Sequence, residues 1–199
     1  MIREKTIRNL KAGTEKMTRS EKLTETICRN AYRVGLSEIG EVDISGLEYE
    51  DWVRDFCKNG CRSFNSSWAC PPAVGTLDEC RERCQQYGHM MLFDRCYKLN
   101  GSYDSIGVQN ALSDFKTIVD RFDELISPIL SRTLFLANEG CDRCAECTWP
   151  DAPCRFPDKL HHTIEGYGFN ITKMARKAGL HYNGGPNTVT FFGALLYDE

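Results

Sequence analysis

Nine of the eleven cysteines stand in two stretches, and the second stretch has the more informative spacing. From Cys141 to Cys147 a cysteine recurs at every third position, and Cys154 follows Pro153. A tight loop with this spacing can present each thiolate to a different iron atom, and bacterial ferredoxins use a related run. Structural zinc is the alternative, although zinc sites are usually built from two separated cysteine hooks. The spacing predicts a [4Fe-4S] cluster bound by Cys141, Cys144, Cys147 and Cys154.

The first stretch is looser and rich in glycine and proline. Its cysteines are Cys57, Cys61, Cys70, Cys80 and Cys84. Pro71 and Pro72 restrict the backbone after Cys70, and Trp68 could shield a cluster from water. The predicted ligands of a second [4Fe-4S] cluster are Cys57, Cys61, Cys70 and Cys80. Cys84 shares a helix face with Cys80, so it could replace Cys80 or bind beside it.

Other polar candidates carry weaker signals. Cys28 and Cys96 fall in a predicted helix and strand, where buried, inert thiols are common. His161 and His162 could bind metal or relay protons, but a position on a helix surface is more typical. Glu165 is interpreted as a solvated charge, with an orienting carboxylate near the second cluster as the alternative.

These residues must be positioned by a small set of helices and strands. Apolar periodicity predicts helices over 18–34, with Ser20 as cap and Gly35 as stop, over 108–126, and over 171–178 behind Asn170. A short helix is predicted over 157–165, and strands over 42–44, 90–97, 133–137 and 189–197. Residues 51–84 lack a regular pattern, which a bound cofactor would explain. The order predicts an α/β or α+β fold, a single sheet with packed helices and two cysteine-rich metal-binding loops.

Length and charge limit the class of protein. The 199 residues suit one metal-binding domain over 18–199 behind a polar leader over 1–17. A net charge of −3 predicts no nucleic-acid footprint, and no apolar run reaches the roughly 18 residues of a membrane span. The charged N-terminus lacks a secretory signal, which predicts a cytoplasmic protein. In a reducing compartment, cysteines bind metal or do redox chemistry more often than they form disulfides.

Two blocks of the sequence resemble a family of predicted metal-binding proteins from anaerobic bacteria and archaea, described as a domain of unknown function. The first block joins Cys57-x3-Cys61 to Trp68-Ala-Cys70-Pro-Pro-Ala-Val-Gly75. The second joins Cys141-x2-Cys144-x2-Cys147 to Pro153-Cys154-Arg-x-Pro157, Glu165 and the pair Gly179-Leu180. The resemblance covers roughly residues 50–197 and implies metal binding, but it implies no particular reaction.

The functional hypothesis is a redox protein with two [4Fe-4S] clusters that passes single electrons between a donor and an acceptor protein. An acidic surface would suit a basic redox partner. One alternative is an iron–sulfur enzyme with a substrate-accessible cluster. The other is a zinc-stabilised interaction module.

Overall fold

The computed structural model describes residues 17–199 and contains one mixed sheet of five strands in the order β1-β2-β5-β3-β4. The strands are β1 (Glu38–Glu41), β2 (His89–Lys98), β3 (Arg132–Ala137), β4 (His162–Thr163) and β5 (Thr188–Asp198). Neighbours are antiparallel except β3 and β4, which are parallel. The predicted single sheet with packed helices is therefore confirmed in its α+β form. The predicted leader over 1–17 lies outside the described residues, except for its last residue.

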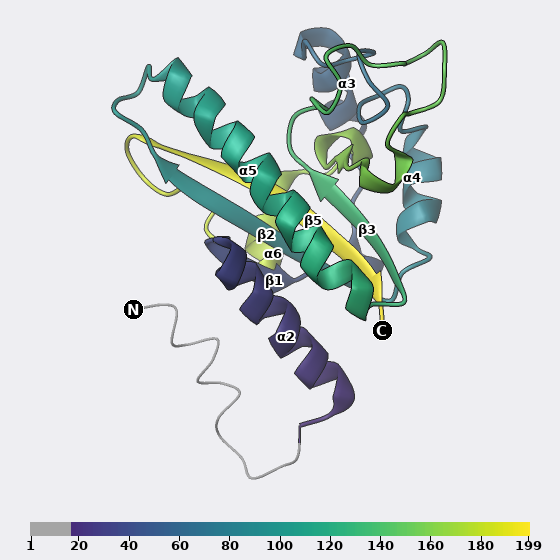
Figure 1. The fold of residues 1–199 in the computed structure, drawn as a ribbon, viewed down its shortest axis with the longest axis vertical. Coiled ribbons are helices and arrows are strands. Elements are labelled where there is room, and N and C mark those ends of the chain that lie inside the picture. The colour runs from purple at the N-terminus through teal and green to yellow at the C-terminus, as the bar shows by residue number, and fades with distance from the viewer. Residues whose placement is uncertain (1–16) are drawn as a thin grey trace.

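Within residues 17–199 five α-helices surround the sheet (Figure 1). They are α2 (Arg19–Val34), α3 (Asp51–Gly60), α4 (Leu77–Cys84), α5 (Ser105–Ile126) and α6 (Ile171–Ala178). Short 3-10 turns are η1 (Ile44–Gly46), η2 (Ser127–Ile129), η3 (Pro157–Lys159) and η4 (Glu165–Tyr167). In this described part of the chain no helix is both long and apolar enough to cross a bilayer.

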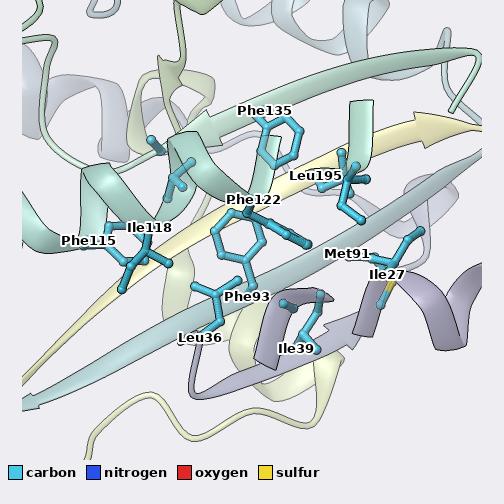
Figure 2. Close-up of a cluster of buried hydrophobic side chains, with 14 of the residues drawn as sticks. Ile27, Leu36, Ile39, Met91, Phe93, Phe115, Ile118, Phe122, Phe135 and Leu195 are labelled. Atoms are coloured by element: carbon cyan, nitrogen blue, oxygen red, sulfur yellow. The ribbon is translucent and has the colours of Figure 1, made fainter. Parts of the chain in front are cut away.

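The sheet is covered on both faces because successive side chains of a strand point to opposite sides. In β2, Met91 and Phe93 belong to the core under α2 and α5, which we call the first core and which Figure 2 shows. Met90 and Leu92 belong to the second core, with residues of α4, α6 and η4. Because the central strands are buried on both faces, their register is strongly specified. The rigid sheet that results supports the loops at its ends.

Several predicted elements are confirmed, with corrections at their ends. The helices predicted over 18–34, 108–126 and 171–178 correspond to α2, α5 and α6, and the three longer predicted strands to β2, β3 and β5. The cap of α2 is Thr18 rather than Ser20, because Thr18 and Glu21 form a reciprocal capping box. Gly35 ends α2 in the left-handed conformation with φ of 108°, as a glycine stop requires.

Three local predictions are wrong. The first strand is Glu38–Glu41 rather than 42–44, and Ile44 begins a 3-10 turn. The helix predicted over 157–165 is instead the turn η3 followed by β4, because His162 and Thr163 pair with β3. Helix α3 was not predicted, because Val53 is its only buried residue and supplies little apolar periodicity.

Candidate metal centre

Both cysteine stretches reach the same end of the molecule, beyond the last residue of β3. In Figure 1 the green loop that follows β3 lies beside α3 and the segment after it. β3 ends at Ala137, and the chain turns through Glu139 and Gly140, with φ of 46° and 54°, directly into Cys141. All eleven cysteines are free of disulfides. The thiols are therefore available as ligands.

The second stretch surrounds one cavity of about 180 Å³. Its walls include all four predicted ligands, Cys141, Cys144, Cys147 and Cys154. Each of these cysteines is partly buried. The indole of Trp68 and the ring of Phe156 also line the cavity. The structure thus brings together the four thiols of the second predicted site, although their loop spans many residues.

Ion pairs from α5 hold this loop in place. The Arg143 guanidinium, between Cys141 and Cys144, pairs with Asp120, and its Nη1 donates to Oδ2 over 3.0 Å. Lys116 Nζ donates to Asp142 Oδ2 over 2.9 Å. Asp120 and Lys116 both belong to α5, a long helix that packs on the sheet. Their ion pairs therefore fix the position of the loop relative to the core. Sequence analysis missed this role of Arg143, although its place inside the cysteine motif was visible.

Opposing influences act on the pKa of the Cys141 thiol in the second loop. Burial raises the pKa of the Cys141 thiol, whereas the Arg143 backbone amide and the Arg143 charge lower it. A positive charge and an N–H group near a thiolate favour the deprotonated form, which is the form that binds metal. Burial outweighs both influences, so the pKa of the Cys141 thiol lies above its ordinary value.

The first stretch contributes three neighbouring thiols. Cys57 lies near the end of α3, Cys61 is the exposed C-cap of that helix, and Cys70 is buried in the loop that follows. The pKa of Cys57 is raised to about 11, chiefly by burial and in addition by negative charge on Glu165, Cys61 or Cys70. Cys70 is in turn within electrostatic range of Cys61. The structure brings Cys57, Cys61 and Cys70 into one neighbourhood.

Cys80, the fourth predicted ligand of this group, has a different environment. Cys80 and Cys84 are fully buried in the second core, on the inner face of α4. The Cys80 thiol donates to the Val74 carbonyl at 3.6 Å, and the charges that act most on it belong to Arg83 and Arg54. Burial raises the pKa of Cys84 to about 11. Both thiols therefore have the surroundings of core residues.

The two groups adjoin. A Cβ atom placed on Gly140 would lie 3.8 Å from Cys70 Sγ, and Gly140 directly precedes Cys141. One backbone turn therefore touches the first group and begins the second.

Two tryptophans tie the stretches together. Trp68, from the first stretch, donates from Nε1 to the Ala152 carbonyl over 3.1 Å. Trp149, from the second, donates from Nε1 to Asn65 Oδ1 over 2.9 Å. The two rings meet edge to face, with centroids 4.7 Å apart. We expected Trp68 to shield the first group, and the structure instead places it against the cavity of the second.

The distances between thiols distinguish a single-ion site from a cluster site. Among residues 17–199 no three His, Cys, Asp or Glu side chains are grouped as one metal ion would require. A tetrahedral zinc with Zn–S bonds of about 2.3 Å would bring its sulfurs to about 3.8 Å from one another. A cluster whose ligands each bind a different iron holds its thiolates farther apart. The four thiols line one cavity, and thiolates are donors that zinc, copper(I) and iron–sulfur clusters all accept.

The histidines and Glu165 lie elsewhere than predicted. The helix-surface interpretation is wrong, because the His161 side chain is only 11% exposed and its Nε2 lies 2.9 Å from Asp123 Oδ2. His162 Nδ1 lies 2.9 Å from the Tyr167 hydroxyl, and burial lowers the pKa of His162 to about 4. Glu165 is half-buried beside Cys57 rather than solvated, and burial raises its pKa to about 7.

The remaining two cysteines lie in regular elements. Cys28 packs against the first core from α2, and burial raises its pKa to about 11. Cys96 is a partly buried residue of β2, opposite Thr190 of β5. Neither is grouped with the cysteines of the two stretches.

Comparison with known proteins gives one match. A family model described as "Predicted metal-binding protein (DUF2284)" matches residues 40–197, a range that includes every cysteine of both stretches. No curated protein and no solved structure matches the chain.

Proposed function

The chain belongs to the DUF2284 family of predicted metal-binding proteins, and from that premise we propose that it is an iron–sulfur redox protein with two [4Fe-4S] clusters. The observation that carries this proposal is the cavity lined by Cys141, Cys144, Cys147 and Cys154 directly beside the Cys57–Cys61–Cys70 group. Soft thiolate ligands select iron–sulfur clusters, zinc or copper(I) among the metals of proteins.

The size of the cavity favours a cluster over a single ion. A single water-sized species needs roughly 10–15 Å³, whereas this cavity measures about 180 Å³. The loop also presents three thiols at every third position, each able to reach a different iron. The cavity, the spacing and the donor type support the same assignment.

The contact between the two groups supports electron transfer. When bound, such clusters accept and release single electrons at potentials set by their surroundings. The chain's own part is to hold two sites together through Gly140 and to limit the access of water. Trp68 and Phe156 form an apolar wall of the second cavity, and Arg143 and Arg155 place positive charge at its edge. Hydrophobic walls and nearby charge are the means by which a protein tunes such a site.

The surroundings of the sites fit an electron carrier that works in the cytoplasm. Cysteine-rich chains without disulfides are typical of a reducing compartment, which supports this location. A net charge of −3 favours a partner with a basic surface, since complementary charge speeds encounter between proteins. The proposed partner is therefore a basic redox protein.

The test is metal analysis of the full chain purified without oxygen. The proposal predicts a brown protein that absorbs near 400 nm, with iron and acid-labile sulfide in equal amounts, about eight of each per chain. Partial reduction should give electron paramagnetic resonance signals of two clusters that interact magnetically, since the two groups adjoin. A colourless protein with stoichiometric zinc and no sulfide would refute the proposal.

A further inference from the structure

The Cys57–Cys61–Cys70 group holds three thiols, whereas a [4Fe-4S] cluster takes four ligands. We infer that the fourth ligand is the carboxylate of Glu165 and that Cys80 remains a core residue. This inference rests on the proposed function, because it assigns a ligand to one of its two sites. It concerns a glutamate that sequence analysis placed in solvent or near the other group.

Packing brings the segment of Glu165 against the loop of Cys70. A Cβ atom on Gly166, the next residue, would lie 3.3 Å from Pro71 Cδ, and Pro71 directly follows Cys70. Just before Glu165, Thr163 donates from its backbone N–H to the Ala69 carbonyl over 2.9 Å. The Thr163 hydroxyl donates to the same Ala69 carbonyl over 3.2 Å. Residues on both sides of Glu165 are therefore fixed to the Cys70 loop.

Helix α3 approaches from the other direction. Arg54, one turn before Cys57, donates to the Gly166 carbonyl and, over 2.6 Å, to the Gly75 carbonyl. Among charged groups, Glu165 acts on the Cys57 thiol more strongly than any other. Glu165 thus lies between the Cys57 end of α3 and the Cys70 loop, where a ligand of a shared cluster would have to stand.

The Glu165 carboxylate lacks the partner that a buried charge usually has. Its Oε1 accepts a hydrogen bond from Asn138 Nδ2 at 2.5 Å, and the charge that acts most on it is the like charge of Glu139. A buried carboxylate is normally paired with a cation or coordinates a metal. An iron atom of a cluster held by the three thiols would be a Lewis acid with one open position, which the Glu165 carboxylate oxygen would fill as the fourth ligand. The Asn138 amide would then orient the carboxylate, as outer hydrogen bonds do for metal ligands.

Cys80 is a poorer fourth ligand. Its thiol points into the second core and already donates to the Val74 carbonyl. A cluster that reached Cys80 would have to displace the apolar residues of the second core that enclose it.

The experiment compares four variants of the full chain, purified and reconstituted without oxygen. They are Glu165→Gln, Glu165→Cys, Cys80→Ala and, as a matched control, Glu139→Gln. Iron, sulfide and electron paramagnetic resonance are measured for each, and circular dichroism verifies folding. We expect Glu165→Gln to lose about half of the iron or to show the signal of a three-iron cluster. Cys80→Ala and Glu139→Gln should keep the full amount, and Glu165→Cys should keep it with a lowered midpoint potential of one cluster.

The outcomes separate the inference from the proposed function. If Glu165→Gln keeps both clusters unchanged while Cys80→Ala loses one, the ligand assignment is overturned and the two-cluster protein stands. If the unmodified chain binds no iron or sulfide, the proposed function itself fails. Should Glu165→Gln not fold, the Glu165→Cys variant decides: an unshifted potential for both clusters excludes residue 165 as a ligand.

Discussion

The two cysteine groups differ in how the chain assembles them. The second group is one loop, from Cys141 to Cys154, whose four thiols line a single cavity. The first is assembled from the end of α3 and the loop that follows it, to which our inference adds Glu165 from the segment after β4. The second group can therefore be deduced from spacing alone. The composition of the first group depends on which segments the tertiary fold brings into contact.

This difference separates local from tertiary information. Spacing at every third residue fixes where thiols point on one short loop. Cys80 shows the limit of such reasoning, because it is close to Cys70 in sequence but belongs to a helix whose inner face is buried in the second core. Glu165 is about a hundred residues from Cys57, yet it acts on that thiol directly.

The largest expected effect comes from breaking one group at a time. Replacing Cys144 by alanine should remove one cluster, so that iron and sulfide fall by about half while the signal of the other cluster remains. Cys57→Ala should give the complementary loss. Iron and sulfide analysis with electron paramagnetic resonance checks both, and Cys96→Ala is the control that should change neither. If either ligand variant loses all its iron, the two groups are not independent sites.

The sheet can be compared with both cysteine groups by its response to pH. The stability of the fold should fall as pH rises, whereas the retention of metal by the two groups should increase. Asp94 in β2 is only 2% exposed, and burial and the Glu38 charge raise its pKa to about 7. As pH rises from 4 to 7 the unfolded chain releases this proton first. The free energy of unfolding should therefore fall, by on the order of 4 kcal/mol for the metal-free protein.

Asp94→Asn should remove the part of this slope that belongs to Asp94 and stabilise the protein above pH 7, whereas Glu165, whose pKa burial also raises to about 7, keeps its own part. Urea unfolding of the metal-free chain between pH 4 and 8 measures the effect. Metal retention should change the other way, because protons compete with iron for thiolates at low pH. A free energy of unfolding that stays constant over this range would contradict the assignment to Asp94.

The same contrast between local and tertiary information explains which elements could be predicted from the sequence. Helix α6 could be predicted to the residue, because Asn170 caps it and Gly179 ends it, both local signals. The segment 157–165 could not, since β4 forms only by pairing with β3. For the site, the second group followed from its own spacing, whereas the contact between Gly140 and Cys70 exists only in the folded chain.

A subtler prediction concerns Trp68, which belongs to the first stretch but lines the cavity of the second. Trp68→Phe keeps an aromatic wall and removes the hydrogen bond to Ala152, which is worth about 1 kcal/mol. Local opening of the wall should become about five-fold more frequent, and oxygen should destroy the second cluster correspondingly faster. The rate is measured by loss of absorbance in a Cys57→Ala background, where only the second cluster remains.

The control for Trp68 is Trp52→Phe, at an exposed tryptophan of α3. It should leave the rate of cluster loss unchanged. If Trp68→Phe slows the loss or leaves it unaltered, Trp68 does not protect the second cavity.

The smallest effect should come from the tether between the second loop and α5. Arg143→Ala removes the ion pair with Asp120, whose side chains are 23% and 36% exposed, so solvent weakens it. We expect a loss of about 0.5–1 kcal/mol and a fall of about 1–4 °C in the melting temperature of the metal-free chain. Asp120→Ala should cost a similar amount of stability, and the double variant little more, because the two residues act as a pair.

Lys159→Ala is the matched control, at an exposed pair with Glu124 at 3.8 Å, and it should have almost no effect. Fully additive losses of stability in the double variant would mean that Arg143 and Asp120 do not act as a pair. The loop would then be held by its own turns rather than by α5, and the second group would depend on local structure alone.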